Sequence, residues 1–346
     1  MKLYEYIIRR IILMFFVLLG VSIIVFYLCR GFPTAFAPWT PYIHGKMTAE
    51  QIQEVIKSHG FDKPLYIQYF YWLKDILSGE WGYTGTWAQH LPANRVFFDR
   101  FPYTVELAIA ATILTVIIGI PLGIISAIKS NKLPDHISRI IALTGYSTPS
   151  YWFGFVLQLV FFFYFSRWGL PYLPSSGAVS SHLIGRVPTI TGIPILDGVL
   201  ACDLEYAWDA FLHLILPSFT LSFISLGFLA RIVRASMLEV LRQDYIIMAR
   251  SKGLKERIVI YKHALRNAMI PAVTLTGMFF ASLLGGAMIS EYVFAWPGVG
   301  QAAVQAVFQG DSNFLLLYSL VLAGVIVIAN LIVDILYTFL DPRIKY

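Results

Sequence analysis

Residues 107–128 read LAIAATILTVIIGIPLGIISAI, an unbroken run in which no side chain is charged. About 20 apolar residues in a helix are enough to span the hydrocarbon core of a bilayer. Lipid offers no hydrogen-bond partner to an open backbone group, so a helix is the form expected of such a run. The stretch therefore predicts a membrane-spanning helix.

Five further runs of at least 18 residues lack Asp, Glu, Lys and Arg: Ile11–Leu28, Ile140–Ser166, Phe211–Ala230, Ala268–Ser290 and Phe314–Val333. The whole chain is 58% hydrophobic and 13% charged, with a mean hydropathy of +0.68. Soluble domains are apolar over only about half of their residues. The sequence predicts an all-α membrane protein with six transmembrane helices.

The distribution of positive charge predicts the orientation of these helices. With the N-terminus inside, 17 of the 26 Lys and Arg fall on inner segments, and the short outer loop at 291–313 has none. Seven of the other nine lie in the long segment 30–103, where charge has little influence on orientation. We therefore expect a multi-pass protein of the plasma membrane with both termini in the cytoplasm.

The first apolar run has an alternative interpretation as a secretory signal peptide, since Arg9 and Arg10 precede it. Its length exceeds the 7–15 residues of a typical signal core, which favours a retained span. Cys29 and Cys202 both fall on the expected outer side, where a disulfide is chemically possible. Two free thiols are the preferred interpretation, because nothing in the sequence brings them together.

The spans divide the chain into three parts. We expect an N-terminal segment with the first span over 1–29, an extracellular region over 30–103, and a five-span core over 104–346. The core includes an extracellular loop at 167–210 and a cytoplasmic loop at 232–267.

The region 30–103 is long enough to contain its own helices. Thr48 and Gln51 form a capping-box pattern for a helix through Ser58, and Gly60 suits its C-terminal end. Pro64 opens a second helix with apolar residues along one face. That face suits the membrane interface, a partner protein or the protein's own helix ends.

Polar residues gather in the third run, at IIALTGYSTPSYWFG. A proline kink flanked by hydroxyl groups suits the wall of a transport pathway, and it equally suits simple helix packing. The candidate pathway residues are Thr144, Ser147, Thr148, Pro149, Ser150, Tyr151 and Trp152.

Two further features, a pair of glycines and the acids of one loop, indicate little about function. Gly119 and Gly123 have the small-xxx-small spacing that lets helices approach closely. The acids of the loop 167–210 are too dispersed for a metal site, and we interpret them as part of a solvated loop.

The sequence lacks the motifs of the common enzyme classes. GKM at 45–47 is not a phosphate-binding loop, and GVGQAA at 298–303 follows a proline rather than a strand. No zinc-protease, serine-hydrolase or cysteine–histidine pattern occurs. We expect no enzymatic activity, no cofactor and no metal, and the net charge of +6 does not indicate nucleic-acid binding.

Residues 244–271, DYIIMARSKGLKERIVIYKHALRNAMIP, form the most charged stretch between two spans. Gly253 suits the left-handed end of a short helix, so the pattern predicts a cytoplasmic helix–Gly–helix elbow. A patch poor in side chains around Ala249 and Gly253 could enter a groove on another protein. Alternatively, the charges only set topology and contact lipid headgroups.

This stretch resembles the cytoplasmic "EAA" loop of ATP-binding cassette (ABC) importer permeases, in particular the dipeptide/oligopeptide permease family. The general motif's Glu and first Ala are replaced here by Ile247 and Met248, as is common in the peptide branch. YIIRRIILMF, GFDKPLYIQYFYWL, FPYTVELA, PSYWFG, SEYVFAWPGVGQAAVQA and DILYTFLDPRIKY also resemble that family, whereas RGFPTAFAP departs from its usual turn. The residues that the resemblance assigns to ATPase coupling are Asp244, Tyr245, Ala249, Arg250, Lys252, Gly253, Leu254, Glu256 and Arg257.

The resemblance implies the type I ABC importer permease fold and a machine of several subunits. Its partners would be a second homologous permease, two ABC ATPases, an extracellular substrate-binding protein and the lipid bilayer. Peptides are the first expectation for the substrate, with oligosaccharides, nickel or glutathione as alternatives. An ATP-independent carrier or channel is a remoter alternative, because no ionisable residue falls at the centre of an expected span.

Overall fold

The computed structural model describes residues 3–31, 37–43 and 47–340, and their side chains over 8–31, 37–43 and 47–333. The described part is helical, and its one β-type contact is a bridge between Tyr83 and Pro92. The elements are α1 (Leu3–Gly31), η1 (Thr40–Tyr42), α2 (Ala49–Ser58), α3 (Leu65–Ser78), η2 (Thr86–Ala88), α4 (Ala93–Ile128), α5 (Leu133–Ser147), α6 (Ser150–Gln158), η3 (Leu159–Tyr164), α7 (Phe165–Arg167), η4 (Ser181–Leu183), α8 (Pro194–Leu200), α9 (Leu204–Val240), α10 (Asp244–Ser251), α11 (Glu256–Ile258), η5 (Val259–Ala264), α12 (Leu265–Ala268), α13 (Ile270–Leu284), α14 (Met288–Val293), α15 (Val299–Gln309) and α16 (Ser312–Leu340).

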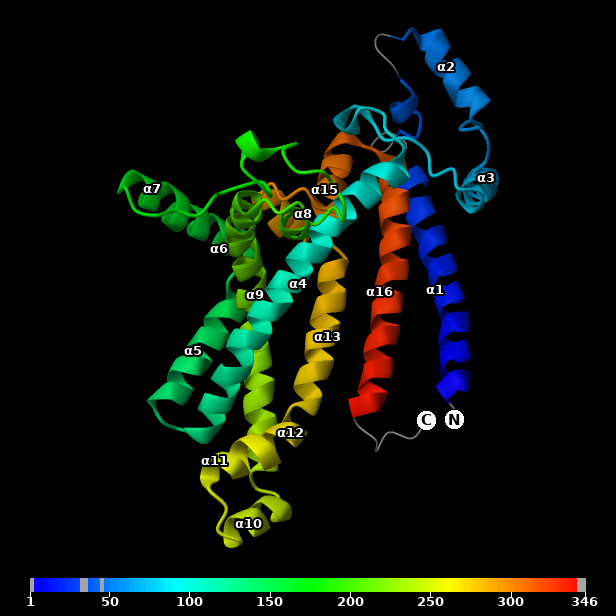
Figure 1. The fold of residues 1–346 in the computed structure, drawn as a ribbon. Coiled ribbons are helices and arrows are strands. Elements are labelled where there is room, and N and C mark those ends of the chain that lie inside the picture. Colours follow the sequence, from blue (N-terminus) through cyan, green and yellow to red (C-terminus); the bar gives the residue numbers. More distant parts are fainter. Residues whose placement is uncertain (1–2, 32–36, 44–46, 341–346) are drawn as a thin grey trace.

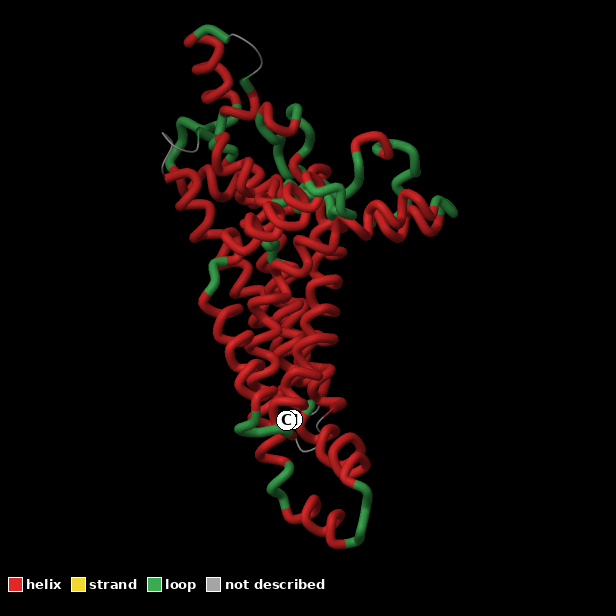
Figure 2. The backbone as a smooth tube through the Cα atoms, turned by 90° about the vertical axis from the view of Figure 1, so that its left-hand side faces the viewer, coloured by secondary structure: helices red, strands yellow, loops and turns green. Residues whose placement is uncertain are grey.

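Four single helices of the described chain are long and apolar enough to cross a membrane: α1, α4, α9 and α16. Two bent helix pairs pass the same test, which gives six crossings if each pair is one span. The helices form an elongated bundle, in which α1 begins and α16 ends at the end that also carries α10 (Figures 1 and 2). The opposite end carries α2, α3, α8 and α15.

The expected third span over 140–166 is not one kinked helix. It divides into α5 and a second segment from Ser150 to Arg167, with a bend of 105° between them. Pro149 causes the break, because a proline disfavours helical geometry in the residue before it, and Thr148 is extended with ψ 124°. The chain beyond the break runs sideways out of the bundle (Figure 1).

Close backbone packing joins α4 to α9. A Cβ atom on Gly123 would lie 2.6 Å from the Ala230 carbonyl oxygen, and one on Gly119 would lie 3.1 Å from that of Leu226. α5 reaches α9 in the same way, since a Cβ on Gly227 would lie 2.6 Å from the Cα of Ala142. The close approach expected from the glycine spacing is confirmed, and it makes α4, α5 and α9 one unit.

The helices of the segment 30–103 follow the sequence pattern. Thr48 and Gln51 form the capping box of α2, Gly60 has a left-handed φ of +67°, and Pro64 precedes α3. On α3, Tyr69, Trp72 and Leu73 pack against Phe26 of α1. The apolar face of α3 therefore covers the protein's own helix ends, one of the three alternatives left open by the sequence.

In the loop 167–210, acidic residues form specific hydrogen bonds and ion pairs that hold the loop in shape. Asp197 is only 4% exposed, and its carboxylate accepts hydrogen bonds from the backbone N–H groups of Thr191 and Gly192. Asp203 caps α9 and pairs with Arg186. The interpretation of this loop as a solvated one was wrong for Asp197, because a buried carboxylate needs such donors.

The α4–α9 contact generates a stability prediction. Gly123→Ala should destabilise the chain by about 1–3 kcal/mol, because the added methyl group forces two helix backbones apart. Gly324→Ala on α16 is the matched control, since no atom of the described residues lies within 4 Å of its Cβ position. Thermal unfolding in detergent measures both, and equal melting temperatures for the two variants would refute the close-contact explanation.

Candidate functional site: the elbow between α9 and α13 and the α5–α9 face

The elbow between α9 and α13 lies at the far end of the bundle, beyond the ends of the other helices (Figures 1 and 2). α10 ends where Gly253 takes a φ of +72°, a conformation that glycine adopts without steric cost. The Gly253 N–H donates to the carbonyl oxygen of Arg250 at 2.9 Å. The expected helix–Gly–helix geometry is present.

The inner face of the elbow packs onto the end of α9. Ile246, Ala249 and Val259 are buried in one cluster with Val233 and Met237 of α9. Ala249 therefore faces the chain's own core, and the exposed part of the expected small-residue patch is reduced to Gly253. This packing makes the elbow a continuation of α9 rather than a free loop.

The outer face of the elbow is apolar and exposed. Its apolar side chains are Tyr245, Ile247, Met248 and Leu254, each more than a third exposed. Single exposed apolar residues are ordinary, but a contiguous group is typical of a contact surface. Asp244, Lys252 and Arg257 are exposed around it.

Polar contacts hold the elbow in shape. Arg250 Nη2 donates to Glu256 Oε1 at 2.7 Å across the glycine turn, and this hydrogen bond raises the pKa of Arg250 above its ordinary value. Asn267 Nδ2 donates to the Tyr245 hydroxyl at 2.8 Å. Both contacts join α10 to the following helix, so two of the expected coupling residues, Arg250 and Glu256, stabilise the turn.

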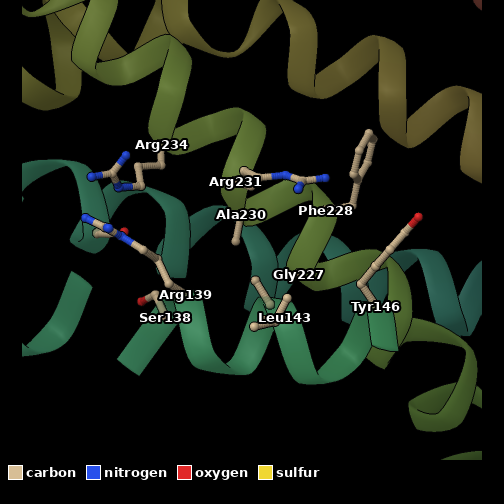
Figure 3. Close-up of a pocket in the computed structure, with 11 residues that line it drawn as sticks. Ser138, Arg139, Leu143, Tyr146, Gly227, Phe228, Ala230, Arg231 and Arg234 are labelled. Carbon is tan, nitrogen blue, oxygen red and sulfur yellow. The ribbon is translucent and has the colours of Figure 1, made fainter. Parts of the chain in front are cut away.

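A cavity of about 420 Å³ opens between α5 and α9 in the half of the bundle nearer the elbow. Arg139 and Arg234 lie at one end of it, and Tyr146 and Phe228 lie at the other (Figure 3). The guanidinium of Arg231 lies over the Phe228 ring, 5.0 Å from its centroid. The cavity combines apolar walls with positive charge.

One buried carboxylate joins three helices beside this cavity. Asp135 of α5 is fully buried and accepts from Arg234 Nε of α9 at 2.7 Å, from Ser126 of α4 and from Arg139. A buried charge is tolerated when it is paired and hydrogen-bonded in this way. Sequence reasoning found no sign of this role for Asp135, because its partners on α4 and α9 lie elsewhere in the chain. Ser126 belongs to the preceding apolar run, and Arg234 follows 99 residues later.

The residues expected to line a pathway lie at the bend between α5 and α6. Thr144, Ser147, Tyr151 and Trp152 are exposed there, and the Thr148 hydroxyl donates to the Thr144 carbonyl oxygen at 2.7 Å. None of the seven lines the cavity, which their neighbours Leu143 and Tyr146 do. The seven expected residues therefore lie near one another at the bend, but they do not line this cavity.

A second cavity, of about 360 Å³, lies between α9 and α13. Its hydroxyl groups come from four helices: Thr115, Ser225, Thr276, Ser282 and Tyr146. Sequence reasoning missed this set because its members lie in four different apolar runs of the chain. Only the packing of α4, α5, α9 and α13 brings them to one space.

With this geometry established, comparison with known proteins identifies the family. Residues 119–346 match the family described as binding-protein-dependent transport system inner membrane component, and residues 3–108 match its N-terminal counterpart. The chain belongs to this family. The resemblance to importer permeases found in the sequence is therefore confirmed.

The similar proteins cover nearly the whole chain. A dipeptide transport system permease protein, DppB, from Alkalihalophilus pseudofirmus is 36% identical over 99% of both chains. The probable D,D-dipeptide transport system permease protein DdpB of Escherichia coli is 38% identical over 95% of this chain and 94% of its own. The oligopeptide transport system permease protein AppB of Bacillus subtilis is 34% identical over 99% of both.

The buried carboxylate beside the cavity generates a second prediction. Asp135→Asn should lower the melting temperature by several degrees, because it leaves Arg139 and Arg234 without their shared countercharge. Asp99→Asn is the control, since Asp99 pairs with Arg95 at 3.7 Å and both side chains are 68% exposed. Exposed pairs contribute little to stability. Thermal unfolding of both variants in the same detergent measures the difference, and an Asp135→Asn variant as stable as the control would contradict it.

Proposed function

We propose that this chain is a permease subunit of an ATP-driven importer of di- and oligopeptides, and that it forms half of the translocation pathway. The observation that supports the peptide substrate most is the similarity, over nearly the full chain, to permeases named for dipeptide and oligopeptide transport. The proposed location is the plasma membrane, with both termini cytoplasmic, as the positive-inside distribution favours.

The elbow is proposed as the contact with an ABC ATPase subunit. Gly253 and Leu254, with Tyr245, Ile247 and Met248, offer an exposed apolar surface, and Asp244, Lys252 and Arg257 would orient the partner by charge. Ala249, Arg250 and Glu256 support this surface from within. An elbow packed on α9 can pass movement to the spans, whereas a flexible loop would absorb it.

The remaining partners are proposed from the same family membership. A second homologous permease would complete the pathway, and the exposed apolar row on α5 (Leu133, Ile137, Ile140, Leu143) is a candidate surface for it. The outer regions 30–103 and 167–210 would meet an extracellular substrate-binding protein. The bend residues Thr144, Ser147, Thr148, Pro149, Ser150, Tyr151 and Trp152 are kept as candidate pathway residues, together with the cavity between α9 and α13.

Uptake measurements distinguish the proposed substrate from its alternatives. Cells that lack the chromosomal copy and carry the gene on a plasmid should take up a labelled dipeptide, and unlabelled oligosaccharide, nickel or glutathione should not compete. Competition by one of these three without competition by peptides would replace the peptide assignment. Uptake that persists after ATP depletion would favour a carrier or channel instead.

The elbow contact generates a third prediction. Gly253→Asp should reduce peptide uptake at least tenfold without lowering the amount of chain in the membrane, because a charged side chain would enter the ATPase contact. Gly253→Ala is the matched control. Like the Asp variant, it places a residue with a side chain in the left-handed conformation, and no described atom lies within 4 Å of the added Cβ. The alanine variant should retain most of the uptake, and normal uptake by the Asp variant would contradict the proposed contact.

A further inference from the structure

Arg30, near the end of α1, is buried, and no described residue forms an ion pair with it. Arg30 is only 7% exposed, and its Nε and Nη1 atoms have no hydrogen-bond partner among the residues that the structure describes. Its Nη2 donates to the neutral Asn313 side chain at 3.1 Å, and its guanidinium lies 4.9 Å from the Phe61 ring centroid. No ion pair joins Arg30 to an acid within the part of the chain that the structure describes.

A buried and unpaired guanidinium is costly unless an anion reaches it. Arg30 lines a cavity of about 90 Å³ that lies between the end of α1, α3 and the start of α16. That is roughly the space of three water molecules, enough for one small oxyanion but not for a peptide. Arginine is well suited to this role, since its planar guanidinium matches phosphate and carboxylate oxygens.

The rim of the cavity carries the opposite charge. Asp75 and Glu80 line the same space as Arg30, and both are exposed. The site thus presents a buried cation at its base and two carboxylates at its mouth. That arrangement fits a zwitterionic group whose anion reaches Arg30 while its cation stays at the surface beside the two carboxylates.

The cavity lies at the end of a membrane span, where a lipid headgroup can reach it. Arg30 ends the membrane span over 8–31, and α3 lies beside the outer end of α1 (Figure 1). One face of α3 covers α1, whereas its other face leaves Tyr66, Phe70 and Leu77 between 59% and 81% exposed. An exposed row of aromatic and aliphatic residues at the end of a span is typical of the headgroup level of a membrane.

We propose that the Arg30 cavity binds the headgroup of an outer-leaflet phospholipid, with its phosphate on Arg30 and its ammonium group facing Asp75 and Glu80. Phosphatidylethanolamine satisfies both requirements, whereas phosphatidylglycerol offers the phosphate alone. The bound lipid would fix α3 and the outer segment against α1 and α16. This site is independent of the transported substrate.

Native mass spectrometry of the full chain, released from nanodiscs of equal phosphatidylethanolamine and phosphatidylglycerol content, tests the proposal. The unaltered chain should retain one phosphatidylethanolamine in preference to phosphatidylglycerol by at least fivefold. Arg30→Gln should lose this lipid, whereas Arg95→Gln, at an exposed arginine of α4, should keep it. Equal lipid retention by the unaltered chain and by Arg30→Gln would overturn the proposal.

A second variant separates the two charges and does not depend on the stability of Arg30→Gln. The double variant Asp75→Asn, Glu80→Gln changes only exposed side chains, and it should retain a phospholipid but lose the preference for phosphatidylethanolamine. An unchanged preference would overturn the assignment of the ammonium group. Soluble phosphoethanolamine or inorganic phosphate is added as a competitor, and displacement of the lipid at micromolar concentration would assign the site to a free oxyanion rather than a membrane lipid.

Discussion

The backbone contact between α4 and α9 is the constraint on which the remaining structure depends. Gly119 and Gly123 bring α4 so close to α9 that the Leu226 and Ala230 carbonyl oxygens occupy the space of absent side chains. Such contacts give van der Waals attraction between backbones in a bilayer, where the hydrophobic effect does not drive helices together. Gly227 extends the same packing to α5, so three helices share one rigid face.

A polar arrangement involving α4 lies toward each end of the bundle. Toward the elbow, Asp135 joins α4, α5 and α9 through Ser126 and Arg234. Toward the other end, the buried Glu291 of α14 accepts from Thr104 of α4 at 3.1 Å and from the Gln301 N–H at 3.0 Å. The elbow continues α9, because Ile246 and Val259 pack against Val233 and Met237. A displacement of the elbow would therefore reach both cavities through a stiff connection.

Sequence reasoning predicted the features that depend on local chemistry. The capping box at Thr48, the helix start after Pro64, the left-handed Gly253 and the glycine contact of α4 all follow from neighbouring residues. Sequence reasoning failed for contacts between residues that are far apart in the sequence. The break at Pro149 was predicted only as a kink. The size of the bend depends on the surrounding helices, and the local sequence does not specify it. Ala249 was expected on an exposed patch, yet α9 covers it, and the pairing of Asp135 with Arg234 has no signal in either stretch alone.

The composition of the assembly tests the central claim most directly. The tagged chain would be purified from its native membranes in mild detergent, and the proteins that accompany it would be identified by mass spectrometry. The proposed function predicts two ATPase subunits and one related permease in fixed proportion, with a substrate-binding protein recovered when peptide is present. Recovery of the chain alone, or only with copies of itself, would contradict the claim that its elbow is an ATPase contact.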